Sequence, residues 1–242
     1  MTDASLLLDR KRVVVIGGGS GIGFAIAELA REVGAEVVIA SSRAATVDTA
    51  VERLPGTTGR VVNLRDEAGI ADFFQQLGGF DHLAITAGDW GGAMFAPTAE
   101  IDLAQAQEGL TVRFWGALAA AKHCCRTIAQ DGSITLTSGM LAHRPIKGAP
   151  VATAVGGAVE HLTRALAIDL APVRVNAVCP GVILTEQVKQ TMPEAMLQSF
   201  VAPLPVPRAG SPGEAAKAYV YLMLNGYATG QILPVDGGGL VV

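Results

Sequence analysis

The fold of this chain is decided by the stretch Val13-Val14-Val15-Ile16-Gly17-Gly18-Gly19-Ser20-Gly21-Ile22-Gly23. Its four consecutive branched apolar residues are typical of a strand buried on both faces of a parallel sheet. Apolar residues then recur at helical spacing from Ile22 to Val33. The pattern predicts a strand, a tight glycine turn and the start of a helix.

The glycine turn has the chemistry of a phosphate site, because glycine permits a close backbone approach and helix N-termini bind anions. Its spacing is G-x-x-x-G-x-G and not the common G-x-G-x-x-G, and a glycine cluster alone can be only a flexible turn. The position between a buried strand and an amphipathic helix favours the pyrophosphate of a dinucleotide. The residues expected to hold it are Gly17, Gly19, Ser20, Gly21, Ile22 and Gly23.

Length and composition restrict the class of protein. The 242 residues fit one large α/β domain, and a net charge of −4 without a basic run argues against nucleic acid as a partner. No run of about 18 apolar residues suggests a membrane span, and Met1 to Arg10 lacks the apolar core of a signal peptide. The three cysteines lack metal-ligand spacing. We therefore expect a cytoplasmic protein with reduced thiols, no metal and a small-molecule substrate.

The second strand, Glu36 to Ala40, bears on the type of cofactor. An acidic residue at the end of this strand would bind the ribose hydroxyls of NAD, whereas a basic residue suits the additional phosphate of NADP. The chain has Ser41-Ser42-Arg43 there. This favours NADP(H) over NAD(H), although Arg43 could also be an exposed residue at a helix start.

The remainder of the chain alternates strands and helices. Strands are predicted at 60–64, 81–88, 133–138, 173–178 and 231–235, and helices at 66–77, 103–125, 155–170 and 212–224. Such alternation predicts a single-domain, doubly wound parallel sheet with helices on both faces and a ligand crevice at the carboxyl ends of the strands. The segments Ala87-Gly88, Ser138-Gly139 and Pro180-Gly181 should converge there, and residues 185–210 could form a substrate lid.

Six motifs together resemble those of the short-chain dehydrogenase/reductase family over nearly the whole chain. They are Ile16-Gly17-x-x-x-Gly21-x-Gly23, Ala87-Gly88, Gly132-Ser133-Ile134, Leu162-Thr163-Arg164-Ala165-Leu166-Ala167, Arg174-Val175-Asn176-Ala177-Val178-x-Pro180-Gly181 and Val235-Asp236-Gly237-Gly238. The resemblance implies a Rossmann fold, a nicotinamide cofactor, a carbonyl or alcohol substrate, and assembly into homotetramers or homodimers. It also adds residues that would line the cofactor. These are Asn63, Leu64, Ala87, Gly88, Pro180, Gly181 and Thr185.

The chain departs from the family pattern at the catalytic positions. The family uses a Tyr-x-x-x-Lys pair with a serine upstream and an asparagine on the preceding helix. Counting back from the motif that begins at Leu162 places Ala152 and Gly156 at the tyrosine and lysine positions. Gly139, next to Ser138, takes the serine position, and Arg113 takes that of the asparagine.

Three residues are candidates for the missing catalytic groups. Arg113 could supply a fixed positive charge, His143 could donate a proton, and Ser138 could donate one hydrogen bond. Each could instead be a surface, interface or packing residue. The sequence therefore supports an NADP(H)-dependent oxidoreductase with a non-standard proton donor. The alternative is a catalytically inactive NADP(H)-binding sensor or partner subunit.

Overall fold

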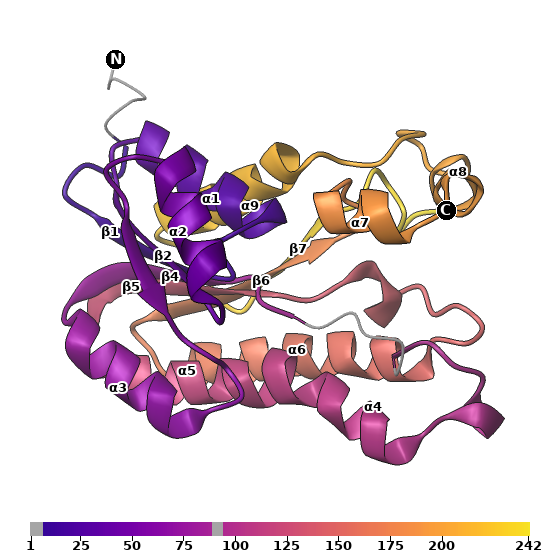
Figure 1. Cartoon of the computed structure of the whole chain (residues 1–242), viewed down its shortest axis with the longest axis horizontal. Coiled ribbons are helices and arrows are strands. Elements are labelled where there is room, and N and C mark those ends of the chain that lie inside the picture. The colour runs from indigo at the N-terminus through magenta and orange to yellow at the C-terminus, as the bar shows by residue number, and fades with distance from the viewer. Residues whose placement is uncertain (1–6, 89–93) are drawn as a thin grey trace.

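Seven parallel strands form one sheet in the computed structural model, which describes residues 7–88 and 94–242 (Figure 1). The order across the sheet is β3-β2-β1-β4-β5-β6-β7, and each neighbouring pair is parallel. The strands are β1 (Arg12–Ile16), β2 (Glu36–Ser41), β3 (Thr58–Val61), β4 (Phe80–Ile85), β5 (Ile128–Thr137), β6 (Arg174–Pro180) and β7 (Ile232–Val235). The predicted doubly wound parallel sheet is confirmed.

Helices cover both faces of the sheet (Figure 1). One layer contains α1 (Gly21–Glu32), α2 (Ala44–Arg53) and α9 (Pro212–Leu224). The opposite layer contains α3 (Glu67–Leu77), α4 (Leu103–Leu110), the π-helical segment η4 (Thr111–Gly116), α5 (Ala117–Cys124) and α6 (Pro150–Asp169). Two short 3₁₀ turns, η3 (Thr98–Glu100) and η5 (Met140–Ala142), and the helices α7 (Glu186–Thr191) and α8 (Glu194–Val201) complete the described elements.

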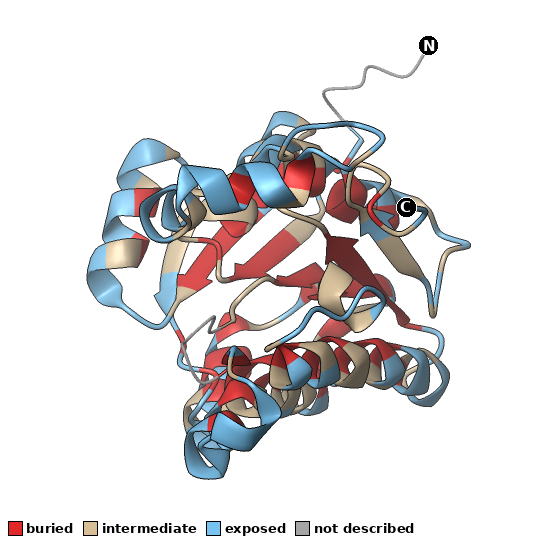
Figure 2. Ribbon diagram, turned by 90° about the vertical axis from the view of Figure 1, so that its right-hand side faces the viewer, coloured by how far each residue is buried: buried red, intermediate tan, exposed pale blue. Residues whose placement is uncertain are grey.

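The core lies in two layers, one on each face of the sheet, and the strands between them are buried (Figure 2). Successive side chains of a strand point to opposite faces. Accordingly, Val14 and Ile16 of β1 pack toward α3 and α5, and Val13 and Val15 pack toward α1 and α9. An uninterrupted apolar run is therefore required at β1, as the sequence pattern indicated.

Several predicted boundaries differ from the observed ones. The third strand spans Thr58–Val61 and not 60–64, and α6 begins at Pro150, five residues before the predicted start. The helix predicted at 103–125 is interrupted by η4. Proline at the first turn of α6 explains its early start, because a proline there loses no helical hydrogen bond. Among the described helices, none is long and apolar enough to cross a membrane.

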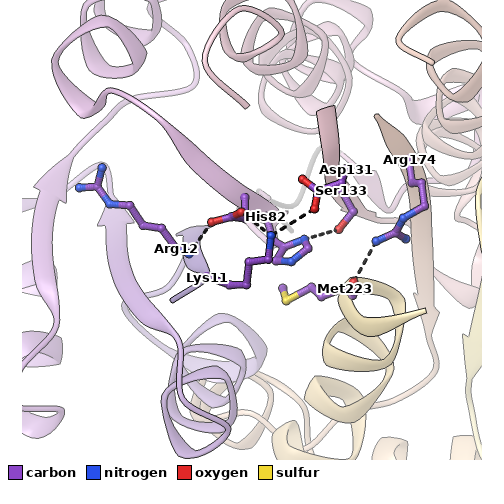
Figure 3. A network of polar contacts seen from close by, with 8 residues as sticks. Lys11, Arg12, His82, Asp131, Ser133, Arg174 and Met223 are labelled. Atoms are coloured by element: carbon purple, nitrogen blue, oxygen red, sulfur yellow. Dashed lines mark hydrogen bonds and ion pairs between the residues drawn. The ribbon is translucent and has the colours of Figure 1, made fainter. Parts of the chain in front are cut away.

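A polar network joins neighbouring strands near their amino ends (Figure 3). We call this side of the sheet its amino edge. Lys11 Nζ lies 2.9 Å from Asp81 Oδ1 and 3.2 Å from Asp131 Oδ2. The buried imidazole of His82 shares a 2.9 Å hydrogen bond with Ser133 Oγ. Arg174 donates to main-chain carbonyls at the end of α9, including a 2.8 Å bond to Met223 O. The network thus links the amino ends of β1, β4, β5 and β6 to α9.

Burial lowers the pKa of His82 to about 4, which makes the free energy of unfolding depend on pH. Between about pH 6.5 and pH 4 the unfolded state binds a proton at His82 that the folded state does not bind. Stability from this group is therefore complete above pH 6.5 and falls as the pH is lowered toward 4, by about 3 kcal/mol in total, since one pKa unit corresponds to about 1.4 kcal/mol.

We expect His82→Asn to remove most of this acid sensitivity, because asparagine can bond to Ser133 but does not titrate. Melting temperatures of the wild type and the variant between pH 4 and 8 provide the measurement. His161→Asn is the matched control, because His161 is exposed on α6. This variant should leave the pH profile of the melting temperature unchanged. Parallel acid profiles for wild type and His82→Asn would contradict the assignment.

Candidate functional site

The glycine turn lies at the carboxyl end of β1, against the end of β4. Gly17 adopts φ +91°, and a Cβ on it would lie 2.5 Å from the amide nitrogen of Ala87. A Cβ on Gly23 would lie 2.2 Å from the carbonyl oxygen of Gly17. Any side chain at these two positions would push the turn away from the sheet, so glycine is a steric requirement of this contact.

The N-terminus of α1 follows this turn. Ser20 is its N-cap and is exposed, with an extended backbone, and its side chain makes no capping hydrogen bond in the described structure. The first amides of a helix have no partners within the helix and favour an anion. Gly21 and Ile22 stand in this first turn and are partly accessible. A diphosphate therefore fits the turn sterically and electrostatically.

Two other predicted cofactor residues lie beside the turn. A Cβ on Gly21 would be 3.1 Å from Thr185 Cγ2, although 164 positions separate the two residues in the sequence. Thr185 is the N-cap of α7 and accepts a hydrogen bond from Val188 N. On the opposite side, a Cβ on Gly19 would be 3.6 Å from Ser41 Cβ. The turn therefore lies between the start of α7 and the end of β2.

The segment after β2, where the sequence predicts contacts with the distal part of a dinucleotide, lies at the surface. Ser42 and Arg43 are exposed, and Arg43 is the N-cap of α2. Farther out, Asn63 is exposed and its Oδ1 accepts a hydrogen bond from Arg65 N. Leu64, in contrast, is buried in the core, where a Cβ on Gly116 would be 2.7 Å from its Cβ.

Arg113 reaches the same edge of the sheet from the helical layer that contains α3 and α5. It lies in η4, and only 7 % of the residue is exposed. A Cβ on Gly88, just beyond β4, would lie 2.4 Å from the guanidinium carbon. Its positive charge also acts on the buried hydroxyl of Tyr219. Burial raises the pKa of this hydroxyl, and Arg113 offsets part of that rise. A fixed charge therefore lies at the predicted crevice.

The local sequence explains how Arg113 comes to lie there. A π-helical turn inserts an additional residue into a helix and changes the direction of the side chains, often at functional sites. Gly116 permits η4 to approach the segment after β3, because a Cβ on it would lie 2.7 Å from the carbonyl oxygen of Leu64. Sequence periodicity does not reveal such a turn.

Ala152 and Gly156 occupy one face of α6, toward η5. Both are buried, and a Cβ on Gly156 would be 3.0 Å from Ala142 Cβ and 3.4 Å from Gly139 O. Gly156 is therefore explained by close packing within the chain. Neither residue has a hydroxyl or an amine that could take part in proton transfer.

The structure brings Ser138 and His143 together through Glu160. Ser138 Oγ donates a 3.0 Å hydrogen bond to Glu160 Oε1, and His143 Nε2 lies 2.8 Å from the same oxygen. Ser138 and Glu160 are buried, at 1 % and 3 % exposure, whereas the His143 side chain is 38 % exposed. No sequence motif indicated Glu160, although it lies one helical turn after Gly156 on the same face of α6.

Cys179 of β6 completes this group of side chains. Its thiol is buried, and burial raises its pKa to about 11. It precedes Pro180 and Gly181, two predicted cofactor residues at the end of β6. Gly181 packs against the segment after β7, where a Cβ on it would be 2.8 Å from Asp236 Cα. Ser138, His143 and Cys179 thus lie on the β5 and β6 side of the crevice.

Two hollows of the described surface lie away from these residues. One of about 630 Å³ is at the amino edge, near Lys11, His82 and Arg174. Another of about 460 Å³ is near the end of α1. Neither is lined by a predicted cofactor or catalytic residue, because the amino edge is opposite the strand ends where the glycine turn lies.

Comparison with known proteins covers almost the whole chain. Residues 17–239 match the family model described as enoyl-(acyl carrier protein) reductase. The short-chain dehydrogenase/reductase ucsE of Acremonium sp is 36% identical over 261 residues, with 97% of each chain covered. A 3alpha-hydroxysteroid dehydrogenase of Mediterraneibacter gnavus is 33% identical, with 96% of this chain and 98% of the relative covered.

Solved structures agree with these matches. A small-chain dehydrogenase in complex with NADPH superposes with a TM-score of 0.83 at 36% identity, covering 96% of this chain and 99% of the other. The MalC reductase/Diels-Alderase from Malbranchea aurantiaca superposes with a TM-score of 0.91 at 30% identity, covering 99% and 100%. The fold, the glycine turn and these similarities over the full length lead to one conclusion: the chain belongs to the short-chain dehydrogenase/reductase family of oxidoreductases.

Proposed function

We propose that the chain is an NADP(H)-dependent reductase of a small carbonyl compound, and that Arg113 replaces the usual proton-donating pair in stabilising the substrate oxygen. The observation that carries the proposal is the buried Arg113 guanidinium beside Gly88, at the edge of the sheet where the glycine turn lies. A similar solved structure, that of a small-chain dehydrogenase, is in complex with NADPH, which supports the choice of cofactor.

The residues present fit the cofactor. The amides at the start of α1 would hold the pyrophosphate, and the exposed Arg43 would meet the 2′-phosphate. Thr185 and Gly88 would line the path between the turn and the catalytic region. When bound, the reduced nicotinamide supplies a hydride to the carbonyl carbon.

Arg113 would act on the charge that develops as the hydride arrives. The electron pair of the C=O π bond moves to oxygen, and the guanidinium stabilises the resulting negative charge until a proton from water completes the alcohol. Arginine suits this role because its guanidinium remains charged. In a buried site such a charge stabilises a nearby oxyanion more strongly than it would in water. Positioning of the two reactants can itself supply roughly 7–11 kcal/mol, so turnover does not require the tyrosine that the family normally uses.

Ser138 and His143 are less favoured as groups that touch the substrate. The Ser138 hydroxyl is buried and directed to Glu160, and the His143 Nε2 contacts the same carboxylate oxygen. Arg113 instead places a fixed positive charge beside Gly88, which neither a hydroxyl nor an imidazole supplies, and it therefore carries the proposed chemistry.

The proposed homodimer or homotetramer has support on the outer surface. Leu103 of α4 is 73% exposed and Trp115 of η4 is 58% exposed. Both side chains belong to the helical layer that contains α4 and η4, and we propose that this layer meets a second copy of the chain.

The function is tested by incubating the purified chain with NADPH and a panel of aldehydes and ketones. We expect NADPH to raise the melting temperature and to be oxidised in the presence of at least one carbonyl compound. Binding without turnover would instead support an inactive NADP(H)-binding protein. An unchanged melting temperature with both NADPH and NADH would contradict the proposal.

Replacement of Arg113 should lower kcat. We expect Arg113→Met to reduce kcat by about 10²- to 10³-fold, the usual effect of removing one group that stabilises an oxyanion, with little change in the Kd of NADPH. Arg113→Lys should retain part of the rate, because it keeps the charge. Equal rates for wild type and Arg113→Met, with the fold intact by circular dichroism, would exclude the role.

Replacement of Arg43 should change cofactor preference. We expect Arg43→Ala to raise the Kd of NADPH by roughly 10- to 100-fold, as a charged hydrogen bond of about 1.5–3 kcal/mol is lost, and to leave the Kd of NADH unchanged. Arg126→Ala is the matched control, because Arg126 is also exposed but precedes β5 at the opposite edge of the sheet. An equal rise in the Kd of NADPH and of NADH would show that Arg43 does not bind the 2′-phosphate.

A further inference from the structure

We propose that His143, Glu160 and Cys179 form a binding site for a divalent zinc ion. The three residues come from the end of η5, from α6 and from β6. One potential ligand atom from each of them lies within 4.8 Å of the other two. Imidazole nitrogen, carboxylate oxygen and thiolate sulfur are the three ligand types that zinc takes from proteins.

The charge of the group favours a cation at this place. Glu160 is almost fully buried, and in the described structure its carboxylate contacts the half-exposed His143 and the Ser138 hydroxyl. A carboxylate removed from water is unfavourable unless a charge compensates it. A zinc ion bound by Glu160 carboxylate, Cys179 thiolate and neutral His143 would give a site of zero net charge.

The geometry needs only a small rearrangement. Bond lengths of about 2.0–2.3 Å to zinc place tetrahedral ligand atoms about 3.3–3.7 Å apart. His143 Nε2 is now 2.8 Å from Glu160 Oε1, so these two atoms must separate slightly, and all three ligand atoms already lie within 4.8 Å of one another. His143 can adjust, because it lies in an exposed segment after η5. Binding releases the Cys179 thiol proton to solvent and also displaces the proton between His143 Nε2 and Glu160 Oε1, so that His143 binds the ion through Nε2 and carries its one proton on Nδ1.

Further contacts would orient the ligands. Ser138 Oγ donates to the Glu160 carboxylate and also lies within hydrogen-bonding range of Cys179. Hydrogen bonds of this kind hold metal-binding carboxylates in place and commonly change metal affinity by about 10- to 100-fold. The exposed side of His143 gives the ion a path of entry and leaves a fourth position for water.

A zinc ion here would tie the η5 segment to α6 and β6, on the substrate side of the crevice. The inference does not depend on the proposed reductase activity, because it rests on these side chains and predicts metal binding by the protein without cofactor or substrate. It also revises the expectation of no metal, which rested on cysteine spacing in the sequence.

Cobalt(II) is the probe, since it replaces zinc and reports its ligands by absorption. We expect the chelator-treated full chain to bind one Co²⁺ per chain, with strong visible bands of tetrahedral coordination and a near-ultraviolet thiolate charge-transfer band. Added Zn²⁺ should displace the cobalt and remove both features. Absence of the charge-transfer band in the wild type would overturn the proposal.

Variants identify the ligands. Cys179→Ser should abolish the charge-transfer band, and Glu160→Gln and His143→Gln should each weaken Co²⁺ binding at least tenfold. Ser138→Ala should weaken it about tenfold. The matched control is Cys124→Ser, which removes another buried free thiol and should leave the spectrum unchanged. If Cys179→Ser does not fold, the Glu160→Gln titration decides, because glutamine keeps the shape of the side chain; undiminished affinity in that variant would refute the site.

Discussion

The close contact between the glycine turn and the end of β4 is the constraint on which the rest of the structure depends. Gly17 approaches the Ala87 amide, and Gly23 approaches the Gly17 carbonyl, at distances that exclude a side chain. Thr86 N donates a 2.8 Å hydrogen bond to Ile16 O and joins the two strand ends. Because the chain winds from β1 toward β3 on one side and from β4 toward β7 on the other, this contact stands at the point where a ligand crevice opens.

The two sides of that crevice are built from different chemistry. The side over β1 and β2 uses backbone amides and an exposed arginine, so it depends on the absence of side chains at Gly17 and Gly23. The side over β5 and β6 uses buried polar side chains, with Glu160 joining Ser138 and His143 through one oxygen. Arg113 stands between the two sides, held there by η4. In the proposed function, cofactor binding and chemistry therefore fall to separate segments of this end of the sheet.

The opposite edge of the sheet has a structural role. There, Lys11, His82 and Arg174 bond to acidic groups, a hydroxyl and carbonyls from neighbouring strands and α9. These groups are paired within the protein, which stabilises the sheet. The carboxyl edge instead leaves the first amides of α1 without a side-chain cap in the described structure. A binding site requires polar groups that can still bond to a ligand. The amides of α1 are such groups, and the paired groups at the opposite ends of the strands hold the sheet that positions them.

Local sequence determined the fold and the glycine turn at which we propose the cofactor binds, because apolar periodicity and glycine placement act over a few neighbouring residues. The strand at Val13–Ile16, the turn to Gly23 and the helix at 212–224 needed no long-range information, and the family motifs added the order of the elements. Tertiary structure alone decided that Thr185 meets Gly21, that Arg113 meets Gly88, and that His143, Glu160 and Cys179 share one small volume. The physical reason is that these contacts join residues from different elements, and their distances are set by how helices pack on the sheet and by a π-helical turn, neither of which leaves a periodic signal in the chain.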